Sequence, residues 1–145
     1  MRWLLAAVVA LSSCGGGPDG PLFDSGWVLT GVVDQGTPAD VPSPASNRWR
    51  LIPSGGCDGD PGCPDGPKLQ GTDLCNSFTR SIRVDGDTVT WGTYWASTAA
   101  ACEAVGRDPI AEFYRQPSFS FVIEGDSMRA TSADGAIELV FTGGL

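Results

Sequence analysis

Short stretches of apolar or alternating residues, separated by turn residues, recur along the chain from Trp27 onward. This pattern predicts short β-strands rather than long helices. Asp85-Gly86 lies between two such stretches, and Asp-Gly in that position is the strongest short-range signal for a hairpin. The predicted strands cover residues 27–33, 48–52, 81–84, 87–91, 119–123, 128–130 and 137–141.

One helix is predicted in the second half of the chain. Asp108 can cap its first turn, and Pro109 suits the first helical position. Ile110, Phe113 and Tyr114 then fall on one face at helical spacing. The three strands that follow alternate apolar and polar residues, which predicts a β-meander with one buried face. The expected fold is therefore mainly β (α+β), an antiparallel barrel-like meander sheet with one short helix packed on it.

Composition narrows the possible functions. The 145 residues have no internal repeat and suit one domain, and 20 Gly with 11 Pro favour many turns. The net charge of −8, with no basic cluster, argues against nucleic acid as a partner. The chain has no His, which removes the commonest general base and zinc ligand. We therefore expect no enzyme activity and no cofactor.

The amino-terminal segment predicts export and lipid anchoring. Arg2 precedes an apolar run, residues 3–11, that is too short to span a bilayer but suits a signal peptide. Leu11-Ser12-Ser13-Cys14 resembles the lipobox of bacterial lipoproteins, which implies cleavage after residue 13 and a diacylglyceryl group on Cys14. The alternative is an ordinary secretory signal that contains a cysteine. We expect residues 14–25 to form a flexible tether and residues 26–145 the folded domain.

The location that follows from this segment is the extracytoplasmic face of the cell membrane, or the outer membrane in a Gram-negative host. The protein's contact with the membrane would be through lipid on Cys14, because an acidic surface is repelled by anionic headgroups. Two or three acyl chains give stable anchoring.

Four cysteines remain if Cys14 is acylated, and an even number in an exported chain favours disulfides. They allow three pairings. We prefer Cys57–Cys63, which brackets a turn-rich segment, together with Cys75–Cys102, which closes a longer loop that would stabilise the fold through chain entropy. A four-cysteine zinc site is the competing interpretation, but no C-x-x-C motif is present.

Two polar clusters are candidates for binding. Asp58, Asp60 and Asp65 lie in a Gly-Pro-rich loop and could offer oxygen ligands to Ca²⁺, although the pattern fails the EF-hand template. The alternative is a solvated turn closed by a disulfide. Asn76 and Ser97-Thr98 flank the cysteines, either as a polar binding patch or as caps of turns.

Several short motifs, taken in order, resemble the META domain family, also called HslJ-like. They include an early tryptophan, Trp27, a helical Glu112-Phe113 and a closing strand pair after Asp134-Gly135. The other matching segments are residues 71–78 (GTDLCNSF), 84–89 (VDGDTV) and 97–102 (STAAAC). The resemblance covers residues 26–142. It implies a mainly β, barrel-like sheet with one packed helix, and proximity or pairing of Cys75 and Cys102. It implies no established catalytic activity, and a loose link to envelope stress.

The function expected from the sequence is that of a monomeric, membrane-anchored, non-catalytic META-like lipoprotein. Its role would be envelope maintenance or binding of an envelope protein. The first alternative is a lipocalin-like carrier of a small apolar ligand, which requires a cavity lined by Trp49, Trp91, Phe119 and Phe121. The second alternative is an enzyme of unknown type, which requires carboxylates that converge in a cleft with strongly shifted pKa values.

Overall fold

The structure, a computed structural model, describes residues 20–24, 26–41, 47–55, 57, 59–73, 76–98 and 108–143. The elements within these residues, in chain order, are α1 (Pro21–Asp24), β1 (Gly26–Asp34), β2 (Thr37–Ala39), β3 (Arg48–Ile52), β4 (Lys68–Asp73), β5 (Asn76–Asp85), β6 (Thr88–Ser97), α2 (Pro109–Arg115), β7 (Ser118–Glu124), β8 (Ser127–Ser132) and β9 (Ile137–Gly143). Both described helices are shorter than a membrane-spanning segment would need to be.

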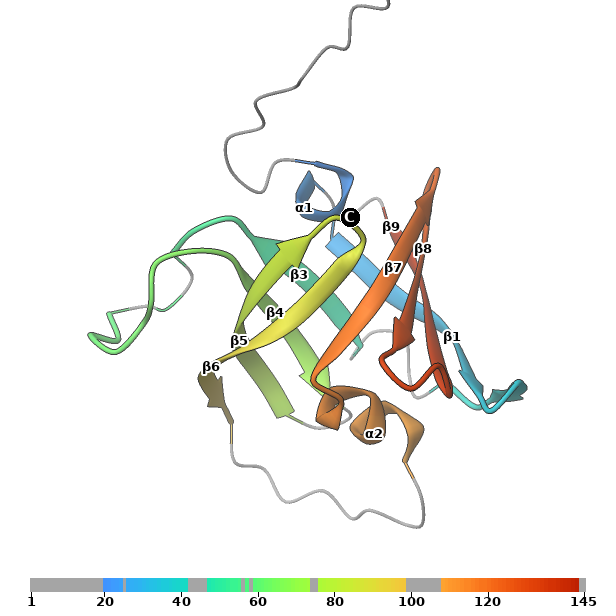
Figure 1. Ribbon diagram of the computed structural model, residues 1–145. Helices are drawn as coiled ribbons and strands as arrows, with labels where there is room; N and C mark the ends of the chain where they lie inside the picture. Colours follow the sequence, from blue (N-terminus) through green and yellow to red (C-terminus); the bar gives the residue numbers. More distant parts are fainter. Residues whose placement is uncertain are drawn as a thin grey trace, which may run out of the picture.

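The strands form a closed antiparallel barrel (Figure 1). Their order in the sheet is β2-β1-β3-β4-β5-β6-β7-β8-β9, and β1 also pairs with β9. That last pairing closes eight strands into the barrel, while β2 is an extra strand that pairs with the end of β1. The structure confirms the predicted mainly β, barrel-like antiparallel sheet.

Strand alternation explains why the barrel interior is apolar. Buried and outward-facing positions alternate along β3 and along β9. The indole of Trp49 lies at the centre, with its ring centroid 4.2 Å from that of Phe141 and 5.3 Å from that of Phe119. The interior at this level is filled by aromatic rings.

Helix α2 lies at one end of the barrel (Figure 1) and forms as the sequence predicts. The Asp108 carboxylate accepts a hydrogen bond from the backbone N–H of Ile110 (3.0 Å). Ile110, Phe113 and Tyr114 are all buried. The Tyr114 hydroxyl accepts a 2.6 Å hydrogen bond from the indole N–H of Trp49, which attaches the helix to the barrel core.

Helix α1 lies at the opposite end of the barrel (Figure 1) and corrects one prediction. The sequence analysis assigned residues 14–25 to a flexible tether, but residues 21–24 are helical and Leu22 is 4 % exposed within the core. The carbonyl oxygen of Leu22 also accepts a hydrogen bond from the indole N–H of Trp27 (3.1 Å). Burial of Leu22 accounts for the difference, so the ordered domain begins before residue 26.

Two strands were missed by the sequence analysis. The region between the predicted strands 27–33 and 48–52 contains β2. Strand β4 was also not predicted, because Leu69 is its only large apolar residue. Its backbone nevertheless pairs with β3 on one side and β5 on the other, and without it the barrel would not close.

Candidate functional site

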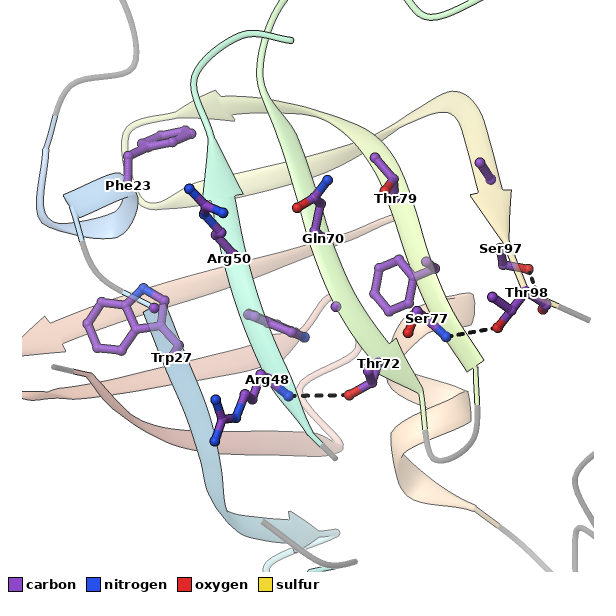
Figure 2. A pocket seen from close by; sticks show the side chains of 15 residues that line it. Phe23, Trp27, Arg48, Arg50, Gln70, Thr72, Ser77, Thr79, Ser97 and Thr98 are labelled. Carbon is purple, nitrogen blue, oxygen red and sulfur yellow. Dashed lines mark hydrogen bonds between the residues drawn. The ribbon is translucent and has the colours of Figure 1, made fainter. Parts of the chain in front are cut away.

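A groove of about 940 Å³ is lined by residues of α1, β1, β3, β4, β5 and β6 and by Thr98 after β6 (Figure 2). Arg48 and Arg50 point outward into the groove. The residues that alternate with them along β3, Trp49 and Leu51, point into the core. Phe23 of α1 lies at one side of the groove (Figure 2). The groove therefore combines two cations with the polar outer face of the neighbouring strands.

Strand register arranges the polar side chains of the groove in rows. Arg50 pairs with Gln70 on β4, and Gln70 pairs with Thr79 on β5. In the adjacent row, the backbone N–H of Arg48 donates a hydrogen bond to the Thr72 hydroxyl (3.3 Å). Each row crosses neighbouring strands, which lie about 4.8 Å apart in a sheet. The result is a compact array of guanidinium, amide and hydroxyl groups.

The other side of the groove is held by hydrogen bonds at the ends of β5 and β6. The backbone N–H of Ser77 donates to the Thr98 hydroxyl (3.1 Å), and the N–H of Thr98 donates to the carbonyl oxygen of Ser77 (3.0 Å). The Thr98 hydroxyl in turn donates to the side-chain oxygen of Asn76 (2.9 Å). Asn76 and Thr98 thus hold the ends of β5 and β6 together, and Thr98 also lines the groove.

The charge of the groove contrasts with that of the whole chain. The chain has a net charge of −8, yet none of the described residues that line the groove is acidic. The guanidinium groups of Arg48 and Arg50 are exposed and form no hydrogen bond or ion pair with another described residue. Residues two apart on one strand face lie about 7 Å apart. Two guanidinium groups at successive outward positions of one strand suit a ligand with more than one carboxylate or phosphate group.

A second polar feature is the loop between β3 and β4, and it contains the predicted disulfide. Cys57 and Cys63 are bonded, with their Cα atoms 5.9 Å apart. Asp60 within the loop accepts a hydrogen bond from the backbone N–H of Gly62 (2.9 Å) and another from the hydroxyl of Tyr94 on β6 (2.8 Å). These two bonds hold the pKa of Asp60 below its usual value, and the bond to Asp60 raises the pKa of Tyr94.

The calcium hypothesis for this loop gains little from the structure. Asp58 lies outside the described residues, and each carboxylate oxygen of Asp60 already accepts a hydrogen bond. Asp65 is exposed. Among the residues that the structure describes, no three potential metal ligands come together.

Several predicted site residues cannot be placed. Cys14, the predicted signal peptide before it, Cys75 and Cys102 all lie outside the described residues. The lipid anchor and the second disulfide therefore stay predictions.

Three of the four aromatic residues that the lipocalin-like alternative assigns to a cavity wall contact one another in the barrel centre. The ring centroid of Phe119 lies 5.3 Å from that of Trp49 and 5.4 Å from that of Trp91, so these three rings pack together. Phe121 lies apart from them and lines a different cavity, at the α1 end.

An inward-facing cation, which the sequence analysis did not identify, lies near α2. The guanidinium carbon of Arg80 is 4.6 Å from the ring centroid of Trp91 and 4.8 Å from that of Trp95. The guanidinium donates a hydrogen bond to the carbonyl oxygen of Tyr114 (3.1 Å), at the carboxyl end of the helix, where a cation is favoured. Burial lowers the pKa of Arg80. Arg80 therefore joins β5 and β6 to α2.

The groove itself was also missed by the sequence analysis. Its one sequence signal is Arg48-Trp49-Arg50, where two cations alternate with a buried aromatic residue. Which residues lie beside these arginines depends on strand pairing, which the pattern alone does not give.

Comparison with known proteins supports the fold only. No family model and no curated protein matches this chain. A protein from Burkholderia xenovorans, with a structure determined by NMR, is similar with a TM-score of 0.60 at 19 % identity. The match covers 97 % of this chain and 99 % of that one. At this level of identity the likeness extends to the fold and not to the activity.

Proposed function

We propose that this chain is a non-catalytic, META-like lipoprotein, anchored outside the cytoplasm through Cys14, whose groove binds an acidic surface of an envelope protein. The anchor rests on the lipobox-like segment that ends at Cys14. The family assignment rests on the motifs between residues 26 and 142, and a barrel with α2 at one end agrees with the fold that the family implies. The barrel alone carries no information on activity.

The observation that carries the proposal is the pair of exposed guanidinium groups in a groove without described acidic residues. Salt at physiological ionic strength screens the repulsion between an acidic partner and this acidic chain beyond about 8 Å. The attraction between the partner's carboxylates and Arg48 and Arg50 acts at contact distance and is screened much less. Arginine and aromatic side chains are also enriched at protein interfaces. Phe23 supplies an aromatic edge of this kind.

The groove is better suited to binding than to catalysis. Its described lining offers hydroxyl, amide and guanidinium groups, but no carboxylate or imidazole that could act as a general base beside a hydroxyl. The alternative of an enzyme of unknown type therefore finds no support at this site.

Photo-crosslinking in the native host would test this proposal. A photoreactive residue replaces Thr79, within the groove, or Val122, which is 56 % exposed on β7. We expect a discrete crosslinked protein from position 79 and none from position 122. The adduct should disappear with Arg48→Glu/Arg50→Glu.

The matched control is Arg115→Glu/Arg129→Glu, which makes the same change of net charge at exposed positions outside the groove. It should leave the adduct unchanged. Equal adducts from positions 79 and 122, or equal loss with both double variants, would show that the groove is not the binding face.

A further inference from the structure

The loop between β3 and β4 reaches across the outer side of the barrel wall. It leaves the end of β3, yet its Asp60 accepts a 2.8 Å hydrogen bond from the hydroxyl of Tyr94 on β6. Strands β4 and β5 lie between β3 and β6 in the sheet. A contact between this loop and β6 therefore spans the outer side of β4 and β5. Residues 59–67 of this loop are called the cover below.

Lys68 lies beneath this span. It is the first residue of β4 and pairs with Ser81 on β5. The Ser81 hydroxyl accepts a hydrogen bond from the backbone N–H of Tyr94 (3.1 Å), so the row that contains Lys68 leads to the tyrosine that binds the cover. Leu69, the next residue of β4, is in the core, and alternation therefore places Lys68 on the outer side. Lys68 is nevertheless 0 % exposed.

The buried amine of Lys68 is held by the cover itself. Its nitrogen donates a 2.9 Å hydrogen bond to the carbonyl oxygen of Gly66. Within the described residues, Lys68 forms no ion pair with a carboxylate. Burial of a cation without a carboxylate partner is costly, because one carbonyl oxygen replaces only part of the lost hydration. The cover is therefore closed against this cost, and opening it returns the amine to water.

The disulfide restricts the movement of the cover. The turn that presents Asp60 to β6 is closed by two backbone bonds, from the N–H of Asp60 to the carbonyl oxygen of Cys57 (3.0 Å) and from the N–H of Cys63 to that of Asp60 (3.1 Å). The disulfide joins the same two cysteines. A crosslink lowers the conformational entropy of an open loop and thereby favours the closed one. Both cysteines are partly exposed, so a thiolate can reach the bond.

We propose that the cover is controlled by redox state: a dithiol reductant opens the disulfide between Cys57 and Cys63, the cover is released, and Lys68 becomes accessible. The dithiol gives two electrons and two protons to the bond, which leaves two cysteine thiols and the oxidised reductant as a disulfide.

The exposed amine would extend the groove. Arg50 pairs with Gln70, and Lys68 lies two residues before Gln70 on β4. Diagonal neighbours of this kind lie about 7–8 Å apart on one face of a sheet. The opened protein therefore presents a third cation beside Arg48 and Arg50. This step rests on the proposed function of the groove, whereas the opening of the cover does not.

Amine acetylation by a water-soluble succinimidyl ester, measured by mass spectrometry on the full-length chain, tests the opening. Lys68 is the only lysine of the chain, so its acetylation reports the cover alone. We expect slow acetylation of the oxidised chain. Treatment with dithiothreitol, or Cys57→Ser/Cys63→Ser, should accelerate it at least about tenfold, because the crosslink no longer limits the entropy of the open loop.

Asp60→Asn tests the contact with β6 without altering the disulfide. An amide oxygen is a weaker acceptor than a carboxylate for the Tyr94 hydroxyl, so acetylation of Lys68 should accelerate about two- to fivefold. The matched control is Asp87→Asn, which makes the same change at an exposed residue of the turn between β5 and β6. It should leave acetylation unchanged.

Photo-crosslinking from position 79 tests the added cation. Cys57→Ser/Cys63→Ser should raise the yield of the adduct, and Lys68→Gln in that variant should remove the gain. An adduct that is absent from every variant would contradict the binding role of the groove, whereas acetylation still decides whether the cover opens.

Four results would overturn the inference. One is acetylation of the oxidised chain as fast as that of the chain unfolded in urea. Another is a steep rise of acetylation in low urea, which indicates global unfolding and not local opening. The third is equal acetylation of the oxidised chain and Cys57→Ser/Cys63→Ser. The fourth is an equal effect of Asp60→Asn and Asp87→Asn, which remains decisive if the double serine variant does not fold.

Discussion

The hydrogen bond between Trp49 and Tyr114 gives a quantitative prediction for the barrel end that α2 covers. The indole N–H donates to the hydroxyl across 2.6 Å, and the two residues are only 2 % and 6 % exposed. Tyr114→Phe removes the acceptor and leaves the N–H buried. Loss of one partner of a buried hydrogen bond costs about 1–3 kcal/mol, because the remaining group keeps its desolvation penalty. We therefore expect the free energy of unfolding to fall by that amount.

Urea denaturation, followed by tryptophan fluorescence and by circular dichroism, measures the change. With a urea m-value of about 1–3 kcal/mol/M, a loss of about 2 kcal/mol lowers the midpoint by roughly 1 M. Tyr94→Phe is the matched control. It removes a tyrosine hydroxyl that also forms a hydrogen bond, but at the surface, and its effect should be much smaller.

A double-mutant cycle separates this bond from ring packing. Trp49→Phe alone, Tyr114→Phe alone and the two together should show a coupling energy of about 1 kcal/mol or more. A coupling near zero, or an unchanged midpoint in Tyr114→Phe, would refute the view that this bond holds the helix to the barrel.

Three other substitutions test the fold and the disulfide loop. Gly71→Ala should destabilise the barrel by about 1–3 kcal/mol, because a Cβ there would lie 2.9 Å from a neighbouring indole ring; an unchanged melting temperature would contradict the packing. Cys57→Ser/Cys63→Ser should lower the free energy of unfolding by about 2 kcal/mol through chain entropy, measured in urea; no change would mean that the loop gains nothing from the bond. Tyr94→Phe should raise the pKa of Asp60 toward its ordinary value in an NMR titration. A carboxylate whose pKa is lowered by folding stabilises the fold at pH values above its unfolded-state pKa, and this gain is lost in acid. The difference in stability between Tyr94→Phe and the unaltered chain should therefore vanish below the folded-state pKa of Asp60.

Most of the barrel could be predicted because its strands alternate and its turns have distinctive residues. Strand β4 is the exception, and its neighbours explain why. Its inward positions are Leu69 and Gly71, so the usual run of large apolar residues is absent. The space beside Gly71 is taken by the rings of Trp49 and Phe78 from the adjacent strands. Which ring fills which gap depends on strand pairing, and the pattern of one strand does not contain that information.

The candidate site was harder to predict than the fold for a related reason. The alternation in β3 places Arg48 and Arg50 on one face, and this much follows from the sequence. The groove also needs Thr72 and Thr79, which are brought beside the arginines only by the register of β4 and β5. Helix α1 places Phe23 beside the groove, because the burial of Leu22 fixes this helix against the barrel. Composition alone assigns these residues to a flexible tether.

The central claim is that this barrel acts from a membrane to which Cys14 attaches it. Intact-mass analysis of the protein purified from its host's membranes tests that claim directly. The account predicts a chain that begins at Cys14, carries a diacylglyceryl group on its sulfur, and has no free thiol at the other four cysteines. A chain that retains Met1, or that has an unmodified thiol at Cys14, would contradict the account.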